Sequence, residues 1–342
     1  MNNLFQQLMN AATRLTRSGD LQAATAAIRA AVGQGVTMPA ANDANDADAI
    51  DVPSRELPTS RASQFIAGNF ATASGSRDYK FFIPAGAGDQ PLSLLVMLHG
   101  CTQNPDDFAA GTAMNDLAQA QGMCVLYPAQ SQQANPQRCW NWFKHSHQQR
   151  GRGEPALLAG LTGQVMGQHA VDPARVYVAG LSAGGAMAAI LGDTYPDLYA
   201  AVGVHSGLAA GAASDLPSAL AAMQGQGGPT RTSAIHVPTI VFHGDADSTV
   251  HPRNGERVAA ASSAGSDQPE VERHQPAGKR RSTRSVHRNA AGKVLAEHWL
   301  VHGAAHAWAG GSARGTYTDA RGPDASAEML RFFLEHPRRA AP

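Results

Sequence analysis

The fold of this chain is decided by one stretch, Arg175-Val176-Tyr177-Val178-Ala179-Gly180-Leu181-Ser182-Ala183-Gly184-Gly185. Its apolar, partly β-branched first half is typical of a strand that is buried on both faces. Its second half fits the G-x-S-x-G pattern, in which a serine occupies a sharp turn between a strand and a helix. The glycines of that pattern, Gly180 and Gly184, leave room where the strand and the helix approach closely. The stretch therefore predicts an exposed nucleophile, Ser182, followed by the N-terminus of a helix.

Strands and helices alternate on both sides of this stretch. Apolar runs that predict buried strands lie at 92–98, 123–127, 201–204, 239–242 and 294–301, and helical patterns lie at 105–120, 157–166 and 324–335. Residues 64–72 and 79–83 flank a Ser-Gly-Ser turn and predict an antiparallel entry hairpin. Such alternation is typical of an α/β fold, a mostly parallel sheet with helices on both faces.

Composition excludes several classes of function. Lys and Arg number 27, as do Asp and Glu, so no long-range field attracts nucleic acid or an anionic membrane. The basic cluster at 279–284 is interpreted as a solvated hairpin face. No apolar run approaches 18 residues, so we expect no transmembrane segment. The 342 residues are enough to bury a sizeable core.

The N-terminal part differs from the rest in composition. Apolar residues recur at helical spacing in residues 1–32, interrupted at Ser18-Gly19-Asp20, which predicts a short helical hairpin. Residues 33–62 are rich in Gly, Pro, Ala, Asn and Asp and predict a flexible linker. The catalytic domain is then expected at 63–338. The first positive charges, Arg14 and Arg17, come too late for a typical secretory signal.

Two further motifs follow predicted strands at the places where acyl transfer needs them. His243-Gly244-Asp245-Ala246-Asp247 follows the strand at 239–242, and Gly303-Ala304-Ala305-His306-Ala307-Trp308 follows the last strand. The order serine, acid, histidine is the order found in α/β-hydrolases. Because the carboxyl ends of parallel strands share one edge of a sheet, we expect these motifs to meet near Ser182.

Each partner of the serine has competitors in the sequence. His298 and His302 lie near His306, but both fall within the strand pattern, so the loop residue His306 is better placed to reach Ser182. Asp245 is an alternative to Asp247 as the acid, and it also fits a role in stabilising the turn.

Six motifs occur together in a fixed order. They are Leu98-His99-Gly100-Cys101-Thr102-Gln103, Cys139-Trp140-Asn141-Trp142-Phe143, Gly151-Arg152-Gly153-Glu154-Pro155, the serine stretch, His243-Gly244-Asp245-Ala246-Asp247 and His306-Ala307-Trp308. In this the chain resembles the polyhydroxybutyrate (PHB) depolymerase family of esterases, related to feruloyl and acetylxylan esterases, over roughly residues 64–336. The resemblance implies an α/β-hydrolase that cleaves carboxylic esters with a Ser182, His306 and Asp247 triad, without metal or organic cofactor.

The same motifs suggest how the rest of the site is built. Backbone N–H groups of Ala183 and of Cys101 or Thr102 are expected to form the oxyanion hole. Cys101 and Cys139 belong to two family motifs that flank the site, and we expect them to lie within disulfide reach. A bond between them would hold the loop of the oxyanion hole in place, whereas an intracellular setting would oppose its formation, so the sequence leaves their oxidation state open. Trp140, Trp142 and Trp308 cluster in predicted loops, which favours a substrate wall over a core position. No C-x-x-C spacing occurs, so we expect no metal site.

The sequence therefore predicts a serine carboxylesterase acting on hydroxyalkanoate esters, either poly(3-hydroxybutyrate) or its oligomers. The alternatives are a feruloyl or acetylxylan-type esterase, and a non-catalytic granule- or glycan-binding protein on a hydrolase scaffold. We expect a cytoplasmic, granule-associated protein, with export by a non-standard signal as the alternative. The apolar stripe of residues 1–32 is expected to be covered by the catalytic domain, by a second copy or by a polymer granule surface. The alternative is that these residues form a weakly ordered appendage.

Overall fold

The computed structural model describes residues 62–72, 75–88, 90–226, 237–264, 266 and 268–338. The chain divides into two units, Met1–Leu57 and Pro58–Pro342, and every described residue belongs to the second. The predicted hairpin at 1–32 and all but the last residue of the linker at 33–62 lie outside the described residues, and so does the predicted tether to a granule.

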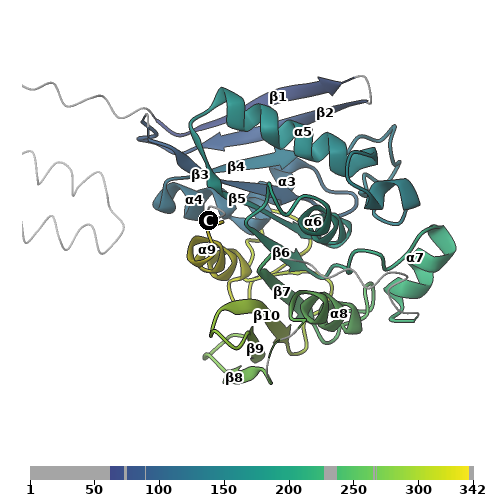
Figure 1. Cartoon of the computed structure of the whole chain (residues 1–342). Coiled ribbons are helices and arrows are strands. Elements are labelled where there is room, and N and C mark those ends of the chain that lie inside the picture. Colours follow the sequence, from purple (N-terminus) through teal and green to yellow (C-terminus); the bar gives the residue numbers. More distant parts are fainter. Residues whose placement is uncertain are drawn as a thin grey trace, which may run out of the picture. The chain divides into compact units, whose positions relative to one another are not determined.

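The catalytic unit alternates strands with helices (Figure 1). Its elements are β1 Gln64–Thr72, β2 Gly75–Ile83, β3 Leu92–Leu98, α3 Pro105–Thr112, α4 Met114–Gln121, β4 Met123–Pro128, η1 His145–Gln148, α5 Gly153–Gln168, β5 Val171–Leu181, α6 Ala183–Thr194, β6 Ala201–His205, α7 Leu216–Met223, β7 Thr239–Gly244, α8 Arg253–Ser262, β8 Glu270–His274, β9 Ser282–Arg288, β10 Val294–Val301, β11 Trp308–Ala309, β12 Thr318–Asp319 and α9 Ala325–Glu335.

Ten of these strands form one sheet in the order β1-β2-β4-β3-β5-β6-β7-β10-β9-β8. The six strands from β4 to β10 in this order run parallel, and an antiparallel hairpin closes the sheet at each side. All parallel strands therefore end at one edge of the sheet, where ligand sites of α/β folds form. The α/β-hydrolase architecture predicted from the sequence is confirmed.

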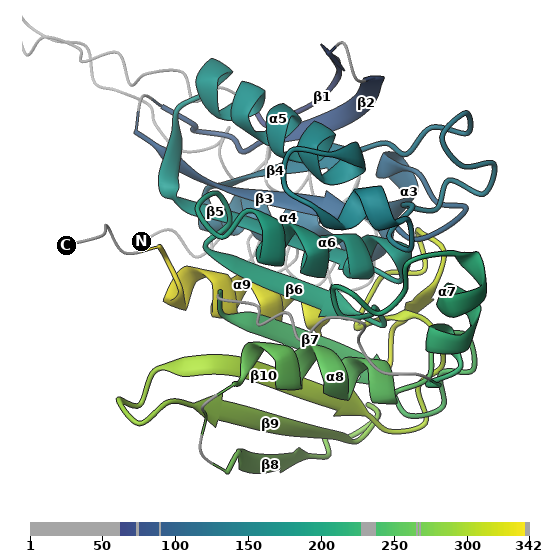
Figure 2. The same ribbon diagram turned by 45° about the vertical axis from the view of Figure 1, so that its right-hand side comes forward.

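Helices cover both faces of the sheet (Figure 2). Side chains of α5, α6 and α8 pack on one face with alternate residues of the strands, and those of α3, α4 and α9 pack on the other. Strand β3 shows the pattern, because Leu94, Val96 and Leu98 face the first layer while Leu95 and Met97 face the second. A strand buried on both faces reads as a continuous apolar run, which is why the sequence reveals these strands clearly.

Some elements differ from their predicted bounds. The helix predicted over 105–120 is two helices, because Ala113 takes a left-handed φ of 51° and breaks it after Thr112. Helix α5 begins at Gly153 rather than at 157, so the last three residues of the Gly-Arg-Gly-Glu-Pro motif lie in its first turn instead of ending a loop. Helix α7 was not predicted, since its eight residues carry two exposed leucines and no clear apolar stripe.

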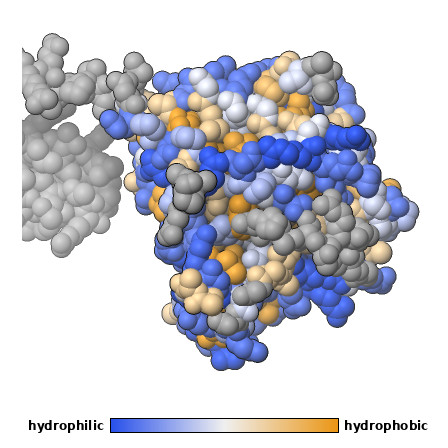
Figure 3. All heavy atoms as spheres, viewed as in Figure 1, coloured by the Kyte–Doolittle hydropathy of each residue, from blue (hydrophilic) through white to orange (hydrophobic). Residues whose placement is uncertain are grey.

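The surface seen in Figure 3 is mixed, with hydrophilic residues over most of it and apolar ones between them. The large apolar side chains exposed among the described residues are Ile66, Leu216, Leu220, Val271, Tyr317 and Leu334. None of the described helices combines the length and the apolar character needed to cross a membrane.

Candidate active site

Ser182 occupies the turn between the central strand β5 and helix α6. Its φ of 58° and ψ of −119° are strained for a residue with a side chain, as in a nucleophile elbow. The turn is this tight because its glycines touch backbone directly. A Cβ on Gly180 would lie 2.4 Å from Gly184 C, and one on Gly184 would lie 2.1 Å from Leu98 O. Ser182 is partly exposed between buried neighbours and makes no side-chain hydrogen bond within the described residues.

An aspartate and a histidine form a hydrogen-bonded pair at the same edge of the sheet. Asp247, in the turn after β7, accepts a hydrogen bond from His306 Nδ1 at 2.7 Å, and its side chain has no exposed surface. Its other oxygen accepts the N–H groups of Thr249 and Val250 at 2.9 and 2.8 Å. Because Nδ1 donates to the carboxylate, Nε2 of His306 is left as the basic nitrogen of the imidazole.

The environment of Asp247 keeps it ionised. Burial raises the pKa of its carboxyl, but hydrogen bonds with His243 and His306 outweigh that effect and hold the pKa well below its usual range. His243 Nε2 lies 3.4 Å from Asp247 Oδ2 and 2.8 Å from Val250 O. An ionised carboxylate that accepts a hydrogen bond from an imidazole stabilises the protonated form of that ring.

The competing residues form a different pair. Asp245 accepts a hydrogen bond from His302 Nδ1 at 2.8 Å and another from Gly303 N at 2.6 Å. His302 Nε2 lies 2.9 Å from Thr283 Oγ1, so both ring nitrogens are engaged away from Asp247. His298 is inside β10, and burial lowers its pKa to about 4. Asp245 thus stabilises the turn, while Asp247 holds His306.

A second histidine, which the sequence did not single out, connects the serine turn to the histidine loop. The carbonyl of His205 accepts the N–H of Ser182 at 2.9 Å, and its Nε2 accepts the N–H of Ala309 at 2.9 Å. Its ring stacks between Phe242 and Trp308. The one sequence signal for this role is a histidine at the end of a buried strand.

The structure contains no hydrogen bond between Ser182 and His306, a contact that often tightens only with substrate.

Two backbone N–H groups are available for an oxyanion. Ala183 begins helix α6, so its N–H has no acceptor within the helix and lies at the positive end of the helix dipole. Among the described residues, the N–H groups of Ala183 and Cys101 donate no hydrogen bond. Thr102 is different, because its N–H donates to Gln137 O at 2.6 Å. Of the predicted pair Cys101 and Thr102, only Cys101 has a free donor.

A disulfide joins Cys101 to Cys139, with 4.2 Å between the Cα atoms. It links the loop after β3 to the loop that contains Trp140. Cys124, on β4, is a buried free cysteine. No group of three or more His, Cys, Asp and Glu within the described ranges is arranged to hold a metal ion.

The predicted substrate wall is wrong for the tryptophans, because all three are core residues. Trp140 is fully buried and its Nε1 donates to His99 O at 3.1 Å, while Trp308, 1% exposed, donates to Ser326 Oγ at 3.0 Å. Trp142 is 5% exposed and packs edge-on against Phe143. Indole N–H groups that find partners inside the protein are typical of structural tryptophans.

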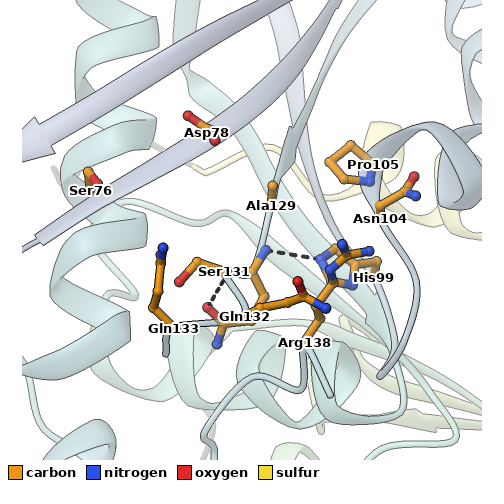
Figure 4. Close-up of a pocket in the computed structure, with 11 residues that line it drawn as sticks. Ser76, Asp78, His99, Asn104, Pro105, Ala129, Ser131, Gln132, Gln133 and Arg138 are labelled. Carbon is orange, nitrogen blue, oxygen red and sulfur yellow. Dashed lines mark hydrogen bonds between the residues drawn. The ribbon is translucent and has the colours of Figure 1, made fainter. Parts of the chain in front are cut away.

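A polar cavity of about 410 Å³ lies beside the loop after β3 (Figure 4). His99 contributes to its lining, and burial lowers the pKa of its imidazole to about 4. The neutral ring accepts Gln130 N–H at Nε2 and contacts Gly100 O through Nδ1 at 2.7 Å. The other lining residues are Ser76, Asp78, Asn104, Pro105, Ala129, Gln130, Ser131, Gln132, Gln133 and Arg138.

Reducing the disulfide is expected to lower both turnover and stability, in a protein that remains folded at the assay temperature. The bond fixes Cys101, whose N–H is an expected oxyanion donor, so its loss should lower kcat for a soluble ester about 10-fold by misplacing that donor. The expected loss of stability is about 3 kcal/mol, from a larger unfolded-state entropy. Both are measured with and without dithiothreitol, at a temperature where circular dichroism shows a fully folded protein.

The matched control for reduction is the double variant Cys101→Ala, Cys139→Ala. It should have the kcat of the reduced protein and should not respond to dithiothreitol. Equal kcat for the oxidised and reduced wild-type protein would contradict a role of the disulfide in the site.

The fold defines the class of the protein, an α/β-hydrolase. The family model described as Esterase PHB depolymerase matches residues 77–266, and the chain belongs to this family.

Curated relatives agree with this assignment. The chain is 31% identical to poly(3-hydroxyalkanoate) depolymerase C of Paucimonas lemoignei over 200 residues, 54% of this chain and 48% of that protein. It is 27% identical to acetylxylan esterase A of Talaromyces purpureogenus over 215 residues, 57% of this chain and 55% of that protein. The chain thus spans about half the length of the curated relatives it matches.

Solved structures support the fold. An acetyl xylan esterase from Aspergillus awamori matches with a TM-score of 0.62 and 17% identity, covering 80% of this chain and 99% of that one. At this identity the likeness concerns the fold alone.

Proposed function

We propose that this protein is a serine carboxylesterase that hydrolyses hydroxyalkanoate esters, either poly(3-hydroxybutyrate) or its oligomers. The observation that carries the proposal is the Asp247–His306 pair at the strand edge that also bears the Ser182 elbow. Membership in the Esterase PHB depolymerase family supports ester hydrolysis, and two relatives named as polyhydroxyalkanoate depolymerases support the substrate class.

The proposed reaction proceeds through an acyl-enzyme. His306 Nε2 takes the proton of Ser182 as Oγ attacks the ester carbonyl, while Asp247 fixes the imidazole tautomer and stabilises its charged form. The N–H groups of Ala183 and Cys101 bind the oxyanion of the tetrahedral intermediate. Each such donor contributes on the order of 3 kcal/mol to transition-state stabilisation. His306 then returns the proton to the leaving alcohol.

The second half of the reaction uses the same groups. His306 takes a proton from water, the resulting hydroxide attacks the acyl carbonyl, and Ser182 leaves with the proton that His306 carries. The product is the free hydroxy acid. No step needs a metal or an organic cofactor.

An acetylxylan-type esterase is the second candidate. It is favoured by relatives with that name, which match over as much of this chain as the depolymerases do. The polar cavity beside His99 also suits a hydroxyl-rich ligand better than an apolar polyester. A feruloyl esterase relative matches a shorter part of the chain, 37%.

One panel of substrates tests the function. We expect the purified protein to hydrolyse p-nitrophenyl butyrate and 3-hydroxybutyrate oligomers, with kcat/KM for the oligomers at least about 10-fold above that for methyl ferulate and acetylated xylan. The difference corresponds to about 1.4 kcal/mol of transition-state binding, the scale of one pocket contact. Release of 3-hydroxybutyrate, ferulate and acetate is measured by chromatography. A preference for acetylated xylan would replace the first candidate by the second.

A further inference from the structure

Helix α5 carries a buried carboxylate in its first turn. Glu154 is 4% exposed, and both of its oxygens accept hydrogen bonds. Oε1 accepts from Arg77 Nη2 at 3.1 Å, from Asn141 Nδ2 at 2.9 Å and from Gln130 Nε2. Oε2 accepts from the backbone N–H of Asn141 at 2.7 Å, and His147 Nδ1 lies 3.5 Å from it. These contacts account for a motif, Gly151 to Pro155, to which the proposed reaction gives no role.

The surroundings of Glu154 keep it charged. Burial raises the pKa of its carboxyl, but the contacts with His147, Gln130 and Asn141 outweigh that effect, and the pKa lies below its ordinary value. Arg77, 8% exposed on β2, balances the charge. A buried ion pair of this kind gives little net stability compared with an apolar pair, so its position needs a further reason.

Two of the residues that donate to Glu154 also involve one loop, residues 137–141, which we call the clamp loop. Asn141 lies in this loop, and Gln130 binds it from outside. Asn141 is bound to Glu154 through both its backbone and its side chain, while Gln130 Nε2 donates to Glu154 and also to Cys139 O at 3.0 Å. Glu154 therefore fixes the clamp loop on both sides of Trp140.

The clamp loop in turn holds residues 99–102, which we call the oxyanion loop. Three links connect them. They are the disulfide between Cys139 and Cys101, the hydrogen bond from Thr102 N to Gln137 O at 2.6 Å, and the hydrogen bond from Trp140 Nε1 to His99 O at 3.1 Å. The path from Glu154 to the N–H of Cys101 thus consists of hydrogen bonds and one covalent bond. Among the three links between the loops, only that of Thr102 with Gln137 joins two exposed residues.

We propose that Glu154 is a positioning residue for the oxyanion hole. Through the clamp loop it sets the place of the Cys101 N–H relative to Ser182, without touching the substrate. The inference rests on the proposed esterase function, and it gives the third motif of the sequence a role in that reaction. A displacement of about 1 Å at a catalytic donor can cost on the order of 100-fold in rate, so a support of this kind bears on turnover.

A carboxylate suits this place because all four hydrogen bonds that Glu154 makes come from N–H donors. Arg77, Gln130 and Asn141 present only N–H groups to the two oxygens. Glutamine has the same shape but one acceptor oxygen, so its amide N–H₂ must face a donor in either orientation. In the orientation that breaks the fewest hydrogen bonds, the amide N–H₂ of the glutamine faces the backbone N–H of Asn141. That hydrogen bond is then lost, and this end of the clamp loop is released.

The test compares Glu154→Gln with a matched control, Glu297→Gln. Glu297 is 1% exposed on β10, and its oxygens also accept only from donors, on Arg284, Arg331 and Trp299, but it contacts neither loop. We expect Glu154→Gln to lower kcat for p-nitrophenyl butyrate about 10- to 100-fold with KM within about threefold, since only the transition state uses the donor. Affinity for a trifluoromethyl ketone, which forms the tetrahedral adduct, should fall by a similar factor.

Glu297→Gln should lose comparable thermal stability and keep kcat within about twofold, below both unfolding transitions. Equal kcat values for the two variants, at equal folded fractions, would overturn the inference. If Glu154→Gln does not fold, Gln130→Met replaces it. This variant removes the link between Glu154 and Cys139 O, and we expect kcat to fall about 5- to 10-fold. An unchanged kcat in Gln130→Met would overturn the inference as well.

The same assays distinguish a failure of this inference from a failure of the proposed esterase function. Wild-type hydrolysis that disappears in Ser182→Ala upholds the esterase, whatever Glu154→Gln does. A folded wild-type protein that hydrolyses no ester of the panel and does not react with a fluorophosphonate would overturn both.

Discussion

Ser182→Ala is expected to lower kcat for p-nitrophenyl butyrate by about 10⁴- to 10⁶-fold while the protein remains folded. The substitution removes the attacking oxygen, and what rate remains comes from the oxyanion donors and substrate binding alone. Stability should change little, because the Ser182 hydroxyl makes no hydrogen bond within the described residues. Turnover is measured together with the thermal unfolding temperature.

The same variant has a chemical control. A fluorophosphonate probe should label the wild-type protein at Ser182, as located by peptide mass spectrometry, and should leave Ser182→Ala unlabelled. Labelling at another serine, or turnover in the folded variant within about 10-fold of the wild type, would reject Ser182 as the nucleophile.

Asp247→Asn should lower kcat by about 10⁴-fold. Asparagine presents an N–H₂ or a single oxygen to His306 Nδ1, so the imidazole takes the wrong tautomer and loses the charge that stabilises its protonated form. The loss of turnover should be severe because the Asp247 side chain has no exposed surface, so water cannot take the place of the carboxylate. The pH profile of kcat/KM for the wild type and the variant measures the change at His306.

Asp245→Asn is the matched control, two residues away in the same turn. Asp245 is 38% exposed and binds His302 and Gly303, not His306. We expect kcat within about 10-fold of the wild type, from a slightly looser histidine loop. A larger loss in Asp245→Asn than in Asp247→Asn would show that Asp245 is the acid.

Much of the fold follows from the sequence because its strands are buried on both faces. The runs 92–98 and 239–242 are apolar except for Ser93 and Thr239, and each is followed by a His-Gly pair at the sheet edge. The G-x-S-x-G pattern describes local backbone geometry, so it located the strained turn at Ser182 directly. The choice between Asp245 and Asp247 remained open, because both are in one turn and differ only in the partners that folding brings to them.

The remaining features depend on contacts between residues far apart in the chain. Trp140 and Trp308 occupy segments predicted as loops, yet they are buried, because His99 and Ser326 satisfy their indole N–H groups. The N–H of Thr102 donates to the carbonyl oxygen of Gln137, 35 residues later, and no sequence pattern predicts that hydrogen bond. Glu154 belongs to a quoted motif, but a single carboxylate in a sequence does not reveal that four donors surround it. The roles of Ser182, His306 and Asp247 in catalysis stay predictions.

The crowding around Gly180 and Gly184 also determines how this protein can be altered in the laboratory. Because backbone atoms lie 2.1 to 2.4 Å from the place of a Cβ, no side chain enters either position without separating β3, β5 and α6. Random mutagenesis of the elbow will therefore return mostly misfolded protein, and its amino acids are poor targets for changing specificity. Libraries aimed at new esters belong in the segments around Gln132 and Tyr317, where side chains meet solvent.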